Sequence, residues 1–113
     1  QLFDKINLAK KYMNDHSHET IKMEDIAREI GMSYSLFRKM FKTYTGFSPG
    51  HYFLQLKLAR SKELLLEGGL TCKEVAFQMG FVTVEHFHSI FRKYYGVSPD
   101  KFRKLNNNQN SKK

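Results

Sequence analysis

Two stretches of the sequence carry side chains that can hydrogen bond to base edges or to phosphates. In the first stretch these are Tyr34, Ser35, Arg38, Lys39 and Lys42, which share one face if the segment is helical. The guanidinium of Arg38 can make a two-point contact with guanine or clamp a phosphate, and the ammonium of Lys39 can do either less specifically. Lys42 lies one turn further along and suits a phosphate contact. This chemistry requires a helix that turns the whole set toward solvent.

The second stretch is less basic. Its candidate residues are Thr83, Val84, Glu85, His88, Ser89 and Arg92. Valine can touch a thymine methyl group, glutamate can accept from cytosine N4, and histidine can donate to a base or a phosphate. An acid at a helix start is also favoured by the helix dipole alone, so both roles stay open for Glu85. Residues 33–45 carry three basic residues and no acid, whereas residues 83–95 carry two basic residues and one acid, so we expect the first stretch to bind an anion more tightly.

Both stretches belong to an internal repeat. Residues 23–49 match residues 72–99 with an offset of 49 that becomes 50 after the glycine, so the second copy holds one extra residue. The inward-facing positions match between the copies: Phe37, Met40, Phe41 and Tyr44 in the first, and Phe87, Ile90, Phe91 and Tyr94 in the second. The outward-facing positions differ. A shared packing face with divergent outer faces favours two surfaces that contact different bases over a helical bundle without a binding role.

The spacing of apolar residues predicts an all-α fold of seven helices. The expected helices span about residues 2–15, 23–30, 34–45, 49–67, 72–79, 84–95 and 99–105. Ser33 and Thr83 are suited to cap helix starts, and Thr71 with Glu74 forms a capping box, whereas Lys22 cannot cap with an oxygen. Glycines at 31, 46, 80 and 96 are expected to end the helices that precede them.

A short helix, a glycine turn and a second helix form the helix-turn-helix pattern. We therefore divide the chain into a first helix-turn-helix subdomain at residues 1–48, a linker helix at 49–67, a second subdomain at 68–105 and a polar tail at 106–113 that we expect to be flexible. A linker helix of roughly 27 Å would hold two recognition helices nearly one turn of B-DNA apart, which is about 34–36 Å.

The composition favours an anionic partner. The formal net charge is +8 and the pI is about 9.6, which suits nucleic acid, an anionic membrane surface or an acidic protein. No apolar run is long enough to span a bilayer, and no signal peptide pattern is present, so we expect a cytoplasmic protein without membrane contact. The single cysteine, Cys72, agrees with a reducing compartment.

No arrangement of residues predicts catalysis, a metal site or a cofactor. His86 and His88 are two apart on an expected helix and point to different sides, and His16 and His18 lie in a loop without further ligands. Cys72 takes the place of Met23 in the repeat. We expect it to act as a small apolar residue, although a thiol at a helix N-terminus can also become reactive.

Residues 8–104 resemble the DNA-binding domain of AraC/XylS-family transcription regulators. The resemblance is carried by residues 26–53, 56–65 and 74–104, and most specifically by Gly80-Phe81, Phe87, Phe91-Arg92-Lys93, Gly96-Val97-Ser98-Pro99 and Phe102-Arg103. It implies seven helices in two helix-turn-helix subdomains joined by a long helix, and no enzymatic activity. The sequence departs from the family at Ser89, where members often carry a basic residue.

We therefore expect sequence-specific binding of double-stranded DNA by a bacterial transcription regulator, with two recognition helices in successive major grooves of an asymmetric site. The alternative is a basic helical module that binds an acidic protein, such as a subunit of RNA polymerase. The chain begins with Gln1, so we expect an N-terminal effector or dimerisation domain outside it.

Overall fold

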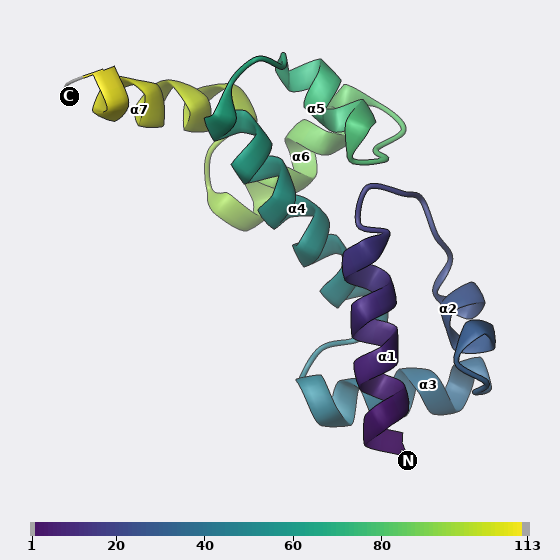
Figure 1. The fold of residues 1–113 in the computed structure, drawn as a ribbon. Helices are drawn as coiled ribbons and strands as arrows, with labels where there is room; N and C mark the ends of the chain where they lie inside the picture. Colours follow the sequence, from purple (N-terminus) through teal and green to yellow (C-terminus); the bar gives the residue numbers. More distant parts are fainter. Residues whose placement is uncertain (1, 112–113) are drawn as a thin grey trace. The chain divides into compact units, whose positions relative to one another are not determined.

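The computed structural model describes residues 2–111, with the side chains of residues 2–106. This part of the chain folds into seven α-helices and contains no strand, which confirms the all-α fold class. The helices are α1 (Leu2–Asp15), α2 (Met23–Glu29), α3 (Tyr34–Thr45), α4 (Pro49–Glu67), α5 (Cys72–Gln78), α6 (Val84–Tyr95) and α7 (Pro99–Ser111), shown in Figure 1.

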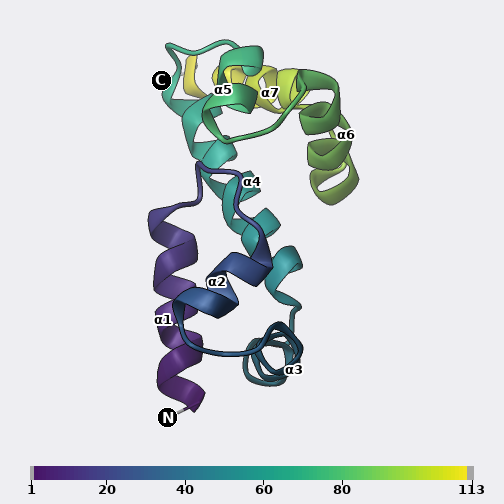
Figure 2. The same cartoon turned by 90° about the vertical axis from the view of Figure 1, so that its right-hand side faces the viewer.

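The helices form two compact units that meet between Lys57 and Leu58, inside α4. In the first unit α3 packs against α1 and α2; it crosses α1 near the N-terminal end of that helix in Figure 1 and is seen end-on in Figure 2. In the second unit α6 packs against α5 and α7. Each unit thus contains one helix-turn-helix pair, α2–α3 or α5–α6.

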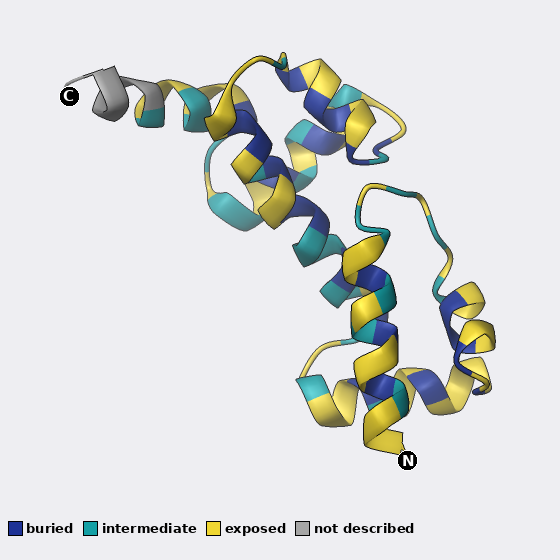
Figure 3. Ribbon diagram, in the orientation of Figure 1, coloured by how far each residue is buried: buried dark blue, intermediate teal, exposed yellow. Residues whose placement is uncertain are grey.

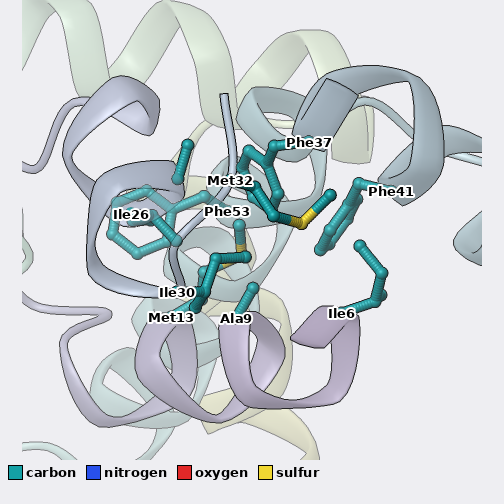
Figure 4. Close-up of a cluster of buried hydrophobic side chains, with 10 residues drawn as sticks. Ile6, Ala9, Met13, Ile26, Ile30, Met32, Phe37, Phe41 and Phe53 are labelled. Atoms are coloured by element: carbon teal, nitrogen blue, oxygen red, sulfur yellow. The ribbon is translucent and has the colours of Figure 1, made fainter. Parts of the chain in front are cut away.

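The core of the first unit collects the apolar residues that recur at helical spacing. Its buried members are Ile6, Ala9, Met13, Ile26, Ala27, Ile30, Met32, Phe37, Phe41 and Phe53 (Figure 4). In the second unit the buried apolar residues are Leu58, Leu64, Leu65, Cys72, Val75, Ala76, Met79, Phe81, Phe87 and Phe91. The opposite faces of the same helices are exposed, as the yellow segments of Figure 3 show. Burial of the apolar faces makes the main favourable contribution to the free energy of folding in a bundle of this size.

The expected helix starts are confirmed. The hydroxyl of Ser33 accepts from the backbone N–H of Leu36, and that of Thr83 accepts from His86. Thr71 and Glu74 form the complete capping box, whereas Lys22 provides no side-chain cap for α2. Gly46 and Gly96 end α3 and α6 with φ of 86° and 82°, a conformation that glycine adopts without strain.

Two expectations were wrong, one about where the last helix ends and one about the orientation of Tyr44. The last helix continues past Leu105 to Ser111, and the side chain of Asn106 extends its bonding by donating to the Phe102 carbonyl at 2.8 Å. The end of the predicted tail, residues 112–113, lies outside the described residues. Tyr44 was expected to face inward but is 48% exposed, because it lies one turn beyond the buried Phe41, near the end of α3. Its ring meets that of Phe3 of α1 with centroids 5.8 Å apart.

A buried lysine ties the loop between α1 and α2 to α4. Lys57 is only 8% exposed, and its Nζ donates to the carbonyl oxygens of Ser17, at 2.9 Å, and Glu19. The same ammonium lies 4.7 Å from the centre of the Phe53 ring. Burial lowers the pKa of Lys57 from 10.5 to about 8, and the nearby charge of Glu19 opposes that shift.

This lowered pKa makes the stability of the first unit depend on pH. Between pH 8 and 10.5 the unfolded chain binds more protons at Lys57 than the folded chain does. The contribution of Lys57 to the free energy of unfolding therefore rises with pH. We expect the free energy of unfolding of the wild type, relative to Lys57→Met, to increase between pH 7 and pH 9.5 in urea titrations. An identical difference at both pH values would contradict the lowered pKa.

Candidate nucleic-acid interface

The outer face of α3 carries all five residues predicted for the first recognition helix. Tyr34, Ser35, Arg38, Lys39 and Lys42 are all exposed. Together with Thr43 they line an open surface hollow of about 570 Å³. The structure therefore brings the predicted set together on one helix face, as their spacing requires.

Thr43 belongs to the same surface but was not among the predicted residues. It lies four residues after Lys39, so helical spacing alone could have included it. Its hydroxyl donates to the Lys39 carbonyl at 2.9 Å. That proton is therefore occupied within the helix, and Thr43 presents to solvent a methyl group and oxygen lone pairs.

The arginines separate into two groups by their partners. Three are engaged within the protein: Arg28 with Asp25 at 2.8 Å, Arg60 with Glu63 at 2.8 Å, and Arg103 with the Leu65 carbonyl at 3.1 Å. Arg38 and Arg92 are exposed, and among residues 2–106, whose side chains the structure describes, they have no hydrogen-bond or ion-pair partner. One lies on α3 and the other on α6. Each helix-turn-helix thus presents one guanidinium that is free to bind an anion from outside.

The outer face of α6 is partly covered. Glu85, Ser89 and Arg92 are exposed, whereas Val84 and His88 are half-buried. Thr83 precedes the helix and is exposed, with its oxygen engaged as the N-cap. All six predicted residues lie at the start of α6 or along it, but fewer of their side chains reach solvent fully than on α3.

The structure adds an acid to this second face. Oδ2 of Asp100, in the first turn of α7, lies 3.9 Å from Nε2 of His88. Oδ1 of the same carboxylate accepts from the thiol of Cys72 at 2.9 Å. Asp100 was not foreseen, because the sequence does not show which side of α7 packs against α6.

Known proteins share both the sequence pattern and the fold. The helix-turn-helix domain family matches residues 26–105. The Msm operon regulatory protein of Streptococcus mutans is 34% identical over 99 residues, which cover 88% of this chain and 36% of that protein. An AraC-type transcriptional regulator from Chromobacterium violaceum has a TM-score of 0.85 and 28% identity, covering 91% of this chain and 92% of its own.

A further structure shows such a fold on DNA. The DNA-binding domain of AdpA, a global transcriptional factor solved in complex with a target DNA, has a TM-score of 0.85 and 25% identity, covering 88% of this chain and 90% of its own. The chain belongs to the AraC family of helix-turn-helix DNA-binding domains. This confirms the predicted resemblance and its consequence that the chain is a DNA-binding domain of a transcription regulator rather than an enzyme.

The AraC-family domain is a part of its longer relatives. The chain spans 36% of the S. mutans protein and 24% of another curated relative. Within the residues that the structure describes, no helix is long and apolar enough to cross a membrane. In the same residues no three His, Cys, Asp or Glu side chains are placed to hold a metal ion, and Nδ1 of His16 instead lies 2.7 Å from Oε2 of Glu19.

The structure distinguishes between the two roles considered for Cys72. The residue is buried, and burial, together with the hydrogen bond to Asp100, raises the pKa of its thiol from 9.0 to about 11. The thiol therefore remains protonated near neutral pH. Cys72 acts in the AraC-family domain as a small packed residue with a directed S–H donor, and not as a reactive thiolate.

Alkylation tests this assignment. Each unit of pKa reduces the thiolate fraction about tenfold, so the folded domain should react with iodoacetamide at pH 8 about a hundredfold more slowly than the urea-unfolded chain, with burial slowing it further. Mass spectrometry of timed samples measures both rates. Equal rates in the folded and unfolded protein would contradict a protonated, buried Cys72.

Proposed function

We propose that this domain binds double-stranded DNA in a sequence-specific manner, with α3 and α6 in successive major grooves of an asymmetric site. The observation that carries the proposal is the placement of the unpaired arginines. Arg38 and Arg92, which have no partner within residues 2–106, lie one on each second helix of the two helix-turn-helix pairs. An exposed guanidinium without an internal partner keeps its donors available for a phosphate or a guanine.

On α3 the proposed roles follow from position along the helix. Tyr34 and Ser35 are at the helix start, where the second helix of a helix-turn-helix approaches the groove floor. Arg38 follows one turn later and makes a two-point contact with guanine, with Lys39 beside it. Lys42 lies a further turn along and contacts a phosphate. The absence of any acid on this helix favours a strong attraction to the DNA backbone.

On α6 the proposed contacts rely less on charge. Val84 touches a thymine methyl group, Ser89 and His88 contact base edges, and Arg92 contacts a phosphate. Thr83 caps the helix and can still donate its hydroxyl proton to the backbone of the DNA. Glu85 keeps its two roles: it is the acid in the first turn of α6, which the dipole favours, and it can accept from cytosine N4.

The length of α4 is compatible with one chain occupying two grooves. Its 19 residues extend over roughly 28 Å at about 1.5 Å per residue. One turn of B-DNA is about 34–36 Å. We propose that tilt of the recognition helices or a bend in the DNA supplies the difference.

The remaining part of the proposal concerns the whole protein. Because its relatives are longer, we propose that an effector or dimerisation domain accompanies this one, that the protein regulates bacterial transcription in the cytoplasm, and that RNA polymerase is a further partner. The rival proposal, a basic module for an acidic protein, is less well supported. The second surface hollow, about 240 Å³ between α1 and α2, is lined by Lys11 but also by Asp15 and Glu29, so its charge is mixed.

Selection from random duplexes tests the proposed function directly. The domain is incubated with a pool of random double-stranded DNA in the presence of heparin, and bound molecules are sequenced over several rounds. We expect a two-part consensus whose halves are separated by about one helical turn. Recovery of DNA without any consensus, at an affinity that heparin abolishes, would overturn sequence-specific binding.

Two substitutions on α3 separate base contact from phosphate contact. Arg38→Ala should cost about 1–3 kcal/mol on the selected site and relax the preference at one base pair, because it removes a two-point contact. Lys42→Ala should weaken binding to all sequences alike and reduce the slope of log affinity against log salt by about one. Fluorescence anisotropy on the selected and a scrambled duplex measures both.

A control accompanies these variants. Lys11→Ala removes one positive charge whose ammonium is already paired with Asp15 at 3.0 Å, so it should change affinity little. If Arg38→Ala lowers affinity equally for the selected and scrambled duplexes, Arg38 contacts the backbone rather than a base.

A further inference from the structure

We propose that Asp100 is a positioning residue for the second recognition helix. Its carboxylate orients the imidazole of His88 so that Nδ1 accepts a hydrogen bond from the amino group of an adenine or a cytosine. This inference rests on the proposed function, since it assigns a base preference to one contact of α6. It also replaces the broader expectation that His88 donates to a base or a phosphate.

The carboxylate is held in place from one side. Oδ1 of Asp100 accepts from the buried thiol of Cys72 at 2.9 Å, and that thiol keeps its proton. Asp100 also lies in the first turn of α7, where the helix dipole favours a negative charge. Oδ1 is therefore engaged by Cys72 at the start of α5, whereas Oδ2 faces His88 on α6.

The imidazole of His88 is restrained as well. Its side chain is 35% exposed, and its ring meets the buried Phe87 edge-on, with centroids 6.2 Å apart. Nε2 lies 3.9 Å from Oδ2 of Asp100, a separation longer than a direct hydrogen bond but within the range of an electrostatic contact or a bridging water. Packing and charge thus favour one orientation of the ring, with Nε2 toward the acid.

A carboxylate beside one ring nitrogen determines what the other nitrogen can do. In neutral imidazole the proton resides on the nitrogen that faces the acceptor, here Nε2, so Nδ1 becomes the acceptor. Phosphates offer no donor to such an atom. In the major groove the available donors are the N6 amino group of adenine and the N4 amino group of cytosine. The arrangement therefore favours contact with a base over contact with a phosphate. It also favours adenine or cytosine over guanine or thymine.

The first copy of the repeat lacks all three parts of this arrangement. The offsets of the repeat place Met23 at the position of Cys72, Arg38 at that of His88 and Gly50 at that of Asp100. Arg38 has no partner among residues 2–106, and a guanidinium offers only hydrogen-bond donors. The orienting acid thus occurs only in the second copy, where the corresponding residue is His88. The neutral imidazole of a histidine can adopt either of two tautomers.

Replacement by asparagine tests the proposal because it reverses the hydrogen-bonding pattern. In Asp100→Asn the amide oxygen accepts from the Cys72 thiol and the amide nitrogen faces His88, so Nε2 becomes the acceptor and Nδ1 the donor. Selection from random duplexes with the wild type should give adenine or cytosine at one position of the half-site bound by α6. With Asp100→Asn we expect that preference to move to guanine or thymine, which offer acceptors, by about five- to tenfold.

Three further variants and one control complete the experiment. His88→Ala and Asp100→Ala should both lose the preference without reversing it, and the double variant His88→Ala/Asp100→Ala should lose no more than either alone, because the two residues act as a unit. Glu24→Gln, which removes an acid from the first turn of α2, is the matched control and should keep the wild-type preference. Thermal unfolding of each variant verifies that the domain is folded.

The outcomes separate this proposal from the proposed function. If the wild type selects no consensus, sequence-specific binding fails and the role of Asp100 fails with it. If the wild type selects a consensus and both Asp100 variants retain the same base at every position, only the role of Asp100 is overturned. A loss of preference in His88→Ala that neither Asp100 variant shares would likewise show that His88 acts without the acid.

Discussion

The structure depends on a pair of phenylalanines in each helix-turn-helix. Phe37 and Phe41 in α3, and Phe87 and Phe91 in α6, are fully buried and meet edge to face with ring centroids 5.6 Å apart. Because the members of each pair are four residues apart, they anchor one face of the helix over a full turn. The rotation of the helix about its own axis is then fixed, and the residues on the opposite face, such as Arg38 and Lys39 on α3, are turned toward solvent. The chemistry of the outer face follows from the packing of the inner one.

The features that local rules determine could be predicted from the sequence. Helix starts at Ser33, Thr71 and Thr83, and the glycines that end α3 and α6, depend on residues within four positions of each other. The same locality explains why helical spacing predicts which residues share the exposed polar face of α3. Features that need the tertiary fold were not predicted. The contact of Lys57 with Ser17 joins residues 40 apart in sequence, and no periodic pattern signals it.

The second candidate site shows the same limit more sharply. Comparison of the two repeat copies predicts that Val84, Glu85, His88 and Ser89 face outward. The structure places them, together with Thr83 and Arg92, at the start of α6 or along it. What the comparison could not supply is the neighbour of His88, because Asp100 belongs to the following helix and its counterpart is Gly50. A repeat reveals the shared scaffold, whereas the residues that make one copy different from the other obtain their surroundings from packing.

Under the proposed function, the two units would also contribute differently to DNA affinity and to discrimination between sequences. Contacts to phosphate contribute to binding of every sequence, whereas contacts to base edges contribute only to the difference between sequences. The outer face of α3 has three basic residues and no acid, so much of its attraction is independent of sequence. The outer face of α6 combines Glu85, His88 and Arg92, and its net attraction to phosphate is small. Under the proposed function, a surface with little general attraction would bind DNA only where its base contacts fit. A single oriented side chain would then have most influence on site choice in the second unit.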